Sequence, residues 1–144
     1  MQKLRVGIIG FGFIGKVHAY GYDTMRYFYS PVPCETEIVK VCTGNPDTAE
    51  RAAEFLSAQA CTDYREITED PDIDIVNICT PNNLHKEALL SALAQNKHIY
   101  CDKPLLANVE EIQEIAAVAA NYSGTLQMTF QNRFFPAVMR AKQL

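Results

Sequence analysis

Short apolar runs alternate with longer amphipathic stretches along most of this chain. The apolar runs are typical of strands that are covered on both faces of a parallel sheet. We expect such strands at residues 4–9, 37–43, 60–61, 73–79, 98–101 and 125–130. Strands that alternate with helices form right-handed crossovers and a mostly parallel sheet with helices on both faces. The sequence therefore predicts a doubly wound α/β fold.

The stretches between these runs carry apolar residues at spacings of three and four, the period of one helix face. They predict helices over residues 13–28, from Pro46 onward, and over 64–69, 83–95, 108–121 and 136–144. Asn45 before Pro46 is typical of a helix N-cap, and Asn108 with Glu111 resembles a capping box. The alternation ends at residue 130, so we place one α/β domain at residues 1–130 and treat 131–144 as a connecting segment.

Composition and charge exclude several classes of protein. The 144 residues are 48% apolar and 21% charged, with a formal net charge of -4, as expected of one globular domain. The absence of a Lys/Arg cluster argues against nucleic-acid binding. The longest apolar stretches end well before the ~18 residues that a membrane span requires. No secretory signal precedes the first strand, so we expect a cytoplasmic protein without a membrane partner.

Cysteine and histidine are not arranged as in a metal site. The five cysteines are widely spaced and lack a CxxC motif, and the three histidines lack ligand spacing. We therefore expect reduced thiols, no disulfide framework and no metal.

Three glycines follow the first predicted strand in the spacing G-x-G-x-x-G: Gly10, Gly12 and Gly15. In a dinucleotide-binding unit the first allows a tight turn, the second lets the backbone approach a pyrophosphate, and the third lets helix and strand pack closely. Free N–H groups at the helix start, around Phe13 and Ile14, then bind the anion. The alternative is a turn that needs glycine only for packing. The position between the first strand and the first helix favours binding.

The end of the second strand bears on which dinucleotide is bound. An acidic residue there usually binds the adenosine ribose and selects NAD. Residues 41–45 contain no carboxylate, and Thr43, Asn45 and Arg51 are suited to a 2'-phosphate. We therefore favour NADP slightly over NAD. The alternative is that Thr43 and Asn45 only cap the helix, with Arg51 solvated.

Three later motifs are far more specific. They are Thr80-Pro81-Asn82-Asn83-Leu84-His85, Asp102-Lys103-Pro104 and Gln131-Asn132-Arg133-Phe134. Each follows a predicted strand, and ligands of open α/β sheets bind at the carboxyl ends of strands. With the opening glycines, these motifs resemble the glucose-fructose oxidoreductase/inositol dehydrogenase (Gfo/Idh/MocA) family over essentially the whole chain.

The resemblance implies roles for individual residues. Thr80, Pro81, Asn83 and His85 should border the nucleotide, although His85 fits equally well as a residue of the first helical turn. Asp102 stands where the family has glutamate, and should pair with Lys103 or orient a backbone N–H. Asn132 and Arg133 resemble residues that face the nicotinamide end or the substrate, with a structural ion pair as the alternative for Arg133.

Lys103 is the catalytic residue that the resemblance implies. Its ammonium would hydrogen-bond the reacting hydroxyl and stabilise charge on that oxygen. We expect the side chain to be partly buried rather than solvated, and the Lys103-Pro104 peptide bond to be cis.

By resemblance, the chain is the N-terminal cofactor-binding part of an NAD(P)-dependent oxidoreductase. Such an enzyme transfers hydride between nicotinamide and a secondary alcohol or ketone of a sugar or polyol. In the family a second domain follows, completes the substrate site and provides the usual assembly surface. Residues 131–144 would begin the connection to it, and the full-length protein could be a homo-oligomer. The competing hypothesis is a non-enzymatic dinucleotide sensor or interaction module.

Overall fold

Six parallel strands form a single sheet in a computed structural model that describes residues 3–144. The strands are β1 (Lys3–Ile9), β2 (Glu35–Cys42), β3 (Gln59–Cys61), β4 (Ile75–Ile78), β5 (His98–Cys101) and β6 (Leu126–Met128). Their order across the sheet is β3-β2-β1-β4-β5-β6, and every neighbouring pair is parallel. The chain reverses its direction of winding between β1 and β4, which is where such sheets bind ligands. The predicted doubly wound fold is confirmed.

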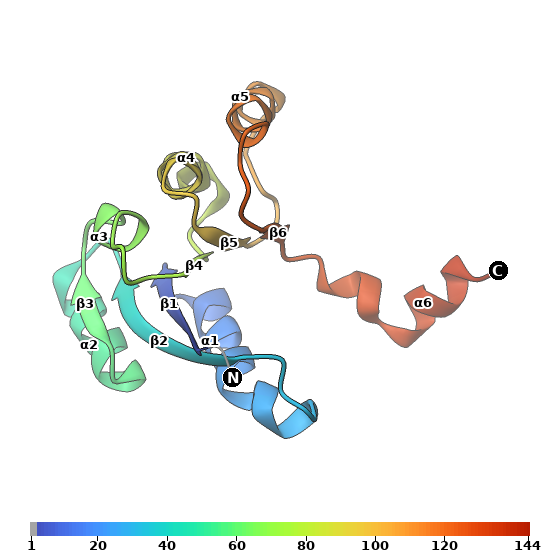
Figure 1. Cartoon of the computed structure of the whole chain (residues 1–144), viewed down its shortest axis with the longest axis horizontal. Helices are drawn as coiled ribbons and strands as arrows, with labels where there is room; N and C mark the ends of the chain where they lie inside the picture. Colours follow the sequence, from blue (N-terminus) through green and yellow to red (C-terminus); the bar gives the residue numbers. More distant parts are fainter. Residues whose placement is uncertain (1–2) are drawn as a thin grey trace.

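Helices cover both faces of this sheet (Figure 1). They are α1 (Phe13–Phe28), α2 (Pro46–Leu56), α3 (Arg65–Thr68), α4 (His85–Ala94), α5 (Val109–Ala119) and α6 (Pro136–Lys142), with 3-10 turns η1 (Asn82–Leu84) and η2 (Gln131–Phe134). α1 and α2 lie on one face, and α3, α4 and α5 lie on the other. α6 extends away from the sheet, and the assignment of residues 131–144 as a connection stays a prediction. No helix within residues 3–144 is long and apolar enough to cross a membrane.

Two apolar cores result, one on each face. Val6, Ile8 and Val41 pack with α1 and α2, whereas Ile9 and Ile78 pack with the helices of the other face. This double burial explains why the strands are largely apolar in the sequence. Gly7 sits in β1 against Ile67, whose side chain occupies the place of a β-carbon. Gly7 therefore serves close packing.

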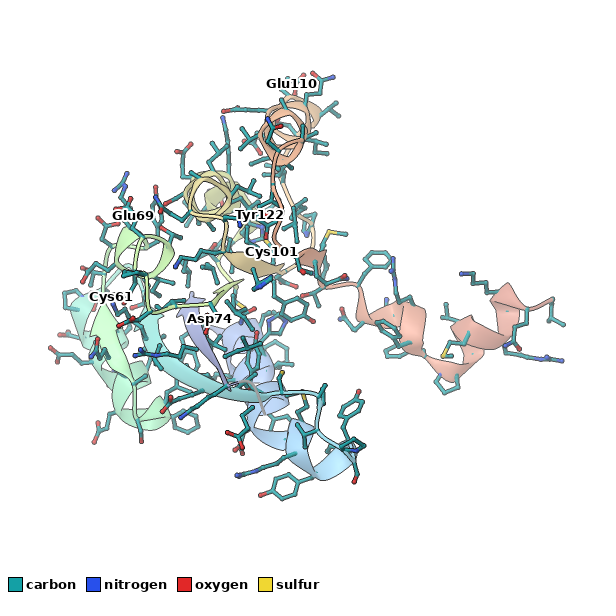
Figure 2. The ribbon with its side chains drawn as sticks, viewed as in Figure 1. Cys61, Glu69, Asp74, Cys101, Glu110 and Tyr122 are labelled. Carbon is teal, nitrogen blue, oxygen red and sulfur yellow. The ribbon has the colours of Figure 1, made fainter. Side chains whose placement is uncertain are left out.

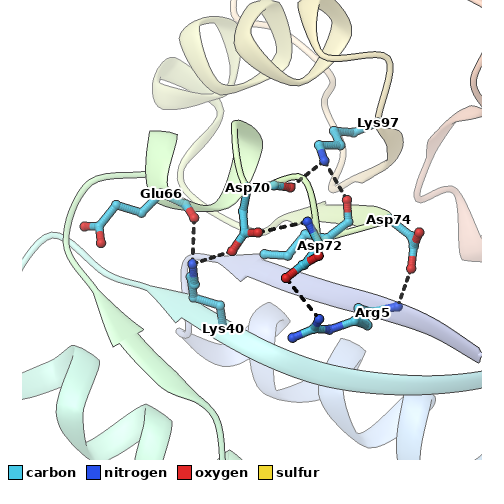
Figure 3. Close-up of polar contacts among 8 residues, drawn as sticks. Arg5, Lys40, Glu66, Asp70, Asp72, Asp74 and Lys97 are labelled. Carbon is cyan, nitrogen blue, oxygen red and sulfur yellow. Dashed lines mark hydrogen bonds and ion pairs between the residues drawn. The ribbon is translucent and has the colours of Figure 1, made fainter.

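A polar network joins β2 to the segments that precede β4 and β5 (Figure 3). The Lys40 ammonium donates to Asp70 Oδ2 at 2.6 Å and to the Glu66 carbonyl at 2.9 Å. The Lys97 ammonium donates to the carbonyls of Asp70 and Ile73 at 2.5 and 2.7 Å. This network anchors the turn before β4 to β2 and to the start of β5. It lies at the edge of the sheet opposite the glycine-rich turn.

We expect Asp70→Asn to destabilise the fold by about 1–2 kcal/mol near neutral pH, because it removes a charged partner from a hydrogen-bonded pair. The side chains of Lys40 and Asp70 are only 16% and 23% exposed. The hydrogen bond from Lys40, then that from the Asp72 N–H, lowers the pKa of Asp70. A lowered folded-state pKa contributes stability that is present above the unfolded value of about 3.9 and is lost as pH falls through the folded value. Urea unfolding at neutral and acid pH should show the difference from wild type shrinking in acid.

Asp23→Asn is the matched control, because its pairing with Arg26 is exposed. It should change stability by less than about 0.5 kcal/mol. Equal effects of the two substitutions would contradict the importance of the Lys40–Asp70 pair.

Candidate functional site

The turn between β1 and α1 requires glycine at two positions for steric reasons. Gly10 has φ +90°, and a β-carbon there would lie 2.8 Å from backbone atoms of Cys79 and Thr80. At Gly15 a β-carbon would overlap the carbonyl oxygen of Gly10. The Gly10 N–H also donates to the Cys42 carbonyl at 2.8 Å, which fastens the turn to β2. These two glycines make the turn and bring the helix close to it.

Gly12 has a different environment. A β-carbon at this position would have no heavy atom within 4 Å, so the fold itself does not require glycine there. Gly12 is the N-cap of α1, where no side chain caps the helix and no acidic residue occupies the first turn. The first N–H groups of a helix lack partners within the helix and carry its positive dipole end. This end of α1, including Phe13 and Ile14, is therefore a fitting site for an anion.

Thr80 contributes a buried hydroxyl without a partner. It follows β4 and lies beside Gly10, and within residues 3–144 its Oγ1 is the buried side-chain oxygen or nitrogen that makes no hydrogen bond. Buried polar atoms in folded proteins nearly always have a partner. The Thr80 hydroxyl is thus available to a ligand at the carboxyl ends of β1 and β4.

His85 is enclosed by protein. The side chain is 1% exposed, with Nε2 2.8 Å from the Thr80 carbonyl and Nδ1 3.1 Å from the Leu105 carbonyl. It joins the loop after β4 to the loop after β5. The structure therefore favours the alternative of a structural residue in the first turn of α4, and contact of the ring with a nucleotide stays a prediction. Pro81 and Asn83 are exposed on the same loop.

Asp102 and Lys103 leave the end of β5 in different environments. Asp102 is buried, and its N–H donates to the Ile78 carbonyl at 2.9 Å. Lys103 is exposed, so the expectation of partial burial is wrong for this chain; no part of residues 3–144 folds over it. The two side chains form no ion pair in the described part of the chain. The Lys103-Pro104 bond is cis, as predicted.

The thiols of Cys79 and Cys101, near the carboxyl ends of β4 and β5, are held in the protonated form. Burial, and next the charge of Asp102, raises the pKa of Cys79 to about 12. Burial likewise raises the pKa of Cys101. Neither thiol is suited to act as a nucleophile at neutral pH.

A buried polar cluster around His18 was missed by the sequence analysis. His18 Nδ1 lies 3.0 Å from Asn77 Oδ1, its Nε2 lies 3.5 Å from Thr129 Oγ1, and its ring stacks on Tyr100 with 4.8 Å between centroids. His18 thus connects α1 to β4, β5 and the end of β6. It also lines an apolar hollow of about 550 Å3 that reaches Asp102. Asn77, a polar residue inside an apolar strand, was the signal that pointed to this cluster.

The structure gives Thr43 and Asn45 the capping role. Asn45 Oδ1 accepts from the N–H groups of Asp47 and Thr48 at 2.9 and 3.4 Å. The Thr43 hydroxyl donates to the Asn45 carbonyl at 2.9 Å. These bonds agree with the capping alternative, and contact of Thr43 or Asn45 with a 2'-phosphate stays a prediction. Arg51 is exposed and, with Lys16 and Thr48, lines a hollow of about 440 Å3.

Asn132 and Arg133 lie in η2, on the segment that leads away from the sheet. Both are exposed, and the Arg133 guanidinium lies 5.6 Å from the centre of the Phe130 ring. Arg133 makes no ion pair in the described part of the chain, so the structure does not support the alternative of a structural ion pair. Within residues 3–144 no three His, Cys, Asp or Glu side chains are grouped to hold a metal ion.

Comparison with known proteins adds independent findings. A family model described as an oxidoreductase family with an NAD-binding Rossmann fold matches residues 4–130. Levoglucosan dehydrogenase of Pseudarthrobacter phenanthrenivorans is 38% identical over 144 residues, which cover 99% of this chain and 37% of that protein. The scyllo-inositol 2-dehydrogenase (NADP(+)) of Bacillus subtilis is 32% identical over 136 residues, covering 92% and 34%.

The likeness extends to three-dimensional structure. The solved complex of levoglucosan dehydrogenase with NADH and levoglucosan superimposes with a TM-score of 0.93 at 37% identity. The match covers 99% of this chain and 39% of that one. The chain therefore spans little more than a third of the relatives it matches.

Proposed function

We propose the function of this chain from one premise: it belongs to the oxidoreductase family with an NAD-binding Rossmann fold, as its Gfo/Idh/MocA motifs predicted. We infer that it is the cofactor-binding part of a dehydrogenase that oxidises or reduces a CH–OH group of a sugar or polyol. The named activities of its relatives, on levoglucosan and scyllo-inositol, support this substrate class. The bound nicotinamide dinucleotide supplies the hydride chemistry, and the protein supplies binding, orientation and proton handling.

The observation that carries the proposal is the contrast among the three glycines. Gly10 and Gly15 are required by the packing of the turn, whereas Gly12 has open space in front of it. Close approach of a ligand to the backbone accounts for a residue without a side chain at Gly12, the start of α1. The uncapped start of α1 supplies N–H groups for a pyrophosphate, and the unpartnered Thr80 hydroxyl lies at the neighbouring strand end. The residues present therefore fit the cofactor.

Lys103 is the residue that we assign to the reacting oxygen. It follows the carboxyl end of β5, and β5 neighbours β4 in the sheet. Thr80 follows the carboxyl end of β4, so both residues lie at the same edge of the sheet. An exposed ammonium there can donate a hydrogen bond to the hydroxyl oxygen of a substrate and stabilise negative charge on it. Asn132 and Arg133 would reach the substrate or the nicotinamide end only in the complete protein.

We further propose that NADP(H) binds more tightly than NAD(H). Two cations, Lys16 and Arg51, line the hollow between α1 and α2, together with the Thr48 hydroxyl and without a carboxylate. A 2'-phosphate is bound by such cations and repelled by carboxylates. The NADP(+) named for the Bacillus subtilis relative agrees with this preference, while NADH in the levoglucosan dehydrogenase complex favours NAD(H). The proposed preference for NADP(H) therefore rests on Lys16 and Arg51 and not on the relatives.

Calorimetric titration with NADH and with NADPH tests both parts. We expect saturable binding of both, with a lower Kd for NADPH. Arg51→Ala should weaken NADPH binding by about tenfold and leave the Kd for NADH unchanged, because one charge-assisted contact to phosphate is lost. Arg140→Ala, an exposed arginine of α6, is the control and should change neither Kd. Equal affinities for the two cofactors would exclude the phosphate site, and binding of neither would contradict the proposed function.

Thr80→Val should weaken binding of the reduced cofactor by about tenfold, because the ligand loses a hydrogen bond from the Thr80 hydroxyl. The same change should leave the thermal unfolding midpoint unchanged or raise it, since it removes an unpartnered buried oxygen and keeps the side-chain shape. Calorimetry and thermal denaturation of one preparation measure both effects. A lower unfolding midpoint with unchanged affinity would mean that the hydroxyl serves the fold alone.

A further inference from the structure

Two buried cysteines lie side by side at the carboxyl ends of β2 and β3. Cys42 and Cys61 are register partners across this strand pair, and both belong to the core under α3. Neighbouring strands are about 4.8 Å apart, and disulfides join α-carbons that are between about 4.4 and 6.8 Å apart. Register partners of parallel strands project from the same face, and the Cys61 thiol lies 3.7 Å from the carbonyl of Val41, the residue before Cys42. This pair has the spacing and the direction that an S–S bond requires.

The backbone of the same two residues holds the candidate site. The Cys42 carbonyl accepts from the Gly10 N–H at 2.8 Å, and the Cys61 carbonyl accepts from the Thr43 N–H at 3.2 Å. Gly10 begins the proposed phosphate-binding turn. It packs so closely against the backbone of Cys79 and Thr80 that a β-carbon would not fit. A covalent bond would draw the two strand ends together, because β-carbons of a disulfide are only about 3.8 Å apart. The movement would pass directly to the glycine turn.

We propose that Cys42 and Cys61 form an intramolecular disulfide on exposure to hydrogen peroxide, and that this bond weakens binding of the dinucleotide. The second half rests on the proposed function, whereas the first half stands on the strand register alone.

The chemistry requires two steps and one equivalent of peroxide. One thiol attacks a peroxide oxygen, which forms a sulfenic acid and releases water. The second thiol attacks that sulfur, forms the S–S bond and releases a second water, so two thiols are oxidised as one peroxide is reduced. Cys61 is the first nucleophile, because it lies on the short edge strand β3 and the neighbouring Cys42 thiol lowers its pKa. The thiolate is the reactive form.

Access to these thiols is through the edge of the sheet. Cys42 and Cys61 are 4% and 6% exposed, but β3 has three residues and lies at the edge of the sheet. Short edge elements open locally at a smaller free-energy cost than the sheet centre. Opening of β3 therefore admits a peroxide to Cys61.

The other buried thiols cannot form such a pair. Cys101 is in register with Ile78 rather than with Cys79. Cys79 contacts His18 on the α1 side, while Cys101 packs with α4 and contacts His85 on the other. Figure 2 shows Cys101 on β5, well separated from Cys61 on β3. Cys79 and Cys101 are thus an internal control pair, which should form no crosslink.

The test begins with the reduced chain treated with hydrogen peroxide, after which catalase removes the oxidant. Alkylation and mass spectrometry should find a peptide pair joined through Cys42 and Cys61 and a loss of two hydrogen masses. The Kd for NADH should rise at least about fivefold, a typical coupling between sites, and return after treatment with dithiothreitol. Linkage requires saturating NADH to lower the ratio of disulfide to dithiol protein in a glutathione buffer by the same factor. Cys61→Ser and Cys42→Ser should abolish the crosslink, whereas Cys34→Ser should retain it.

Two results would overturn the inference. A reduced protein that binds NADH but forms no Cys42–Cys61 crosslink under peroxide would contradict the disulfide. A crosslinked protein with unchanged Kd would contradict its effect on binding. Failure of the reduced wild-type chain to bind NADH would contradict the proposed function instead, and the crosslink measurement would still decide the thiol chemistry.

Discussion

Replacement of Gly12 by valine should remove NADH binding and leave the thermal unfolding midpoint within error of wild type. The reason is that a β-carbon at Gly12 meets no protein atom within 4 Å, whereas the valine side chain fills the space in front of the first N–H groups of α1. Loss of two charge-assisted hydrogen bonds to a pyrophosphate corresponds to an affinity loss of at least about 100-fold. Calorimetric titration and thermal denaturation of the variant measure both quantities.

Two other glycines provide matched controls. Gly10→Ala should destabilise the protein by about 2 kcal/mol or more, because φ is +90° and backbone atoms of Cys79 lie 2.8 Å from the added carbon. Gly21→Ala, inside α1 with no atom within 4 Å, should raise stability by up to about 1 kcal/mol and leave the Kd for NADH unchanged. A Gly12→Val variant that unfolds like Gly10→Ala, or that binds NADH normally, would contradict the assigned role of Gly12.

Lys103→Ala in the complete protein should lower kcat by about a thousandfold, the contribution typical of a group that acts on the reacting oxygen. The Kd for NADH should change little, because Lys103 is exposed and separate from the glycine turn. Steady-state kinetics with a polyol substrate, together with a binding titration, would separate the two effects. The exposed Lys142 of α6 offers a control, since Lys142→Ala should leave kcat unchanged.

The same substitution distinguishes the dehydrogenase from a non-enzymatic dinucleotide sensor. A dehydrogenase loses turnover and keeps cofactor binding. A protein that shows no turnover before the change and binds cofactor equally well after it would behave as a sensor, and Lys103 would then have no chemical role.

Local sequence patterns predicted most of the strands and helices, because apolar spacing and helix caps involve residues that are close together in the sequence. Double burial made β1 and β4 largely apolar, and the N-caps at Asn45 and Asn108 marked the starts of α2 and α5. The alternation of strand and helix then determined the parallel sheet. Boundaries differed where tertiary packing decided them: the helix expected from residue 83 begins with a 3-10 turn, and β6 is shorter than predicted.

Side-chain roles in the site were harder to predict, because they depend on partners distant in the sequence. The buried ring of His85 hydrogen-bonds to the carbonyls of Thr80 and Leu105, which the fold brings together from two different loops. His18 meets Asn77, 59 residues away, across α1 and β4. Lys103 was expected to be partly buried from its neighbours in sequence, yet its exposure depends on what covers the edge of the sheet. The motifs predicted which loops form the candidate site. Only the folded structure distinguishes side chains that can face a ligand from side chains that hold these loops together.

The most direct test of cofactor binding at the glycine turn is a titration of the 15N-labelled chain with NADH, followed by amide chemical shifts. The account predicts saturable shifts at Gly12, Phe13 and Ile14, and at Thr80 beside them, with little change at the opposite edge around Asp70 and Lys97. Saturable shifts confined to other residues, or no shifts in a folded sample, would contradict the claim that this turn holds the pyrophosphate.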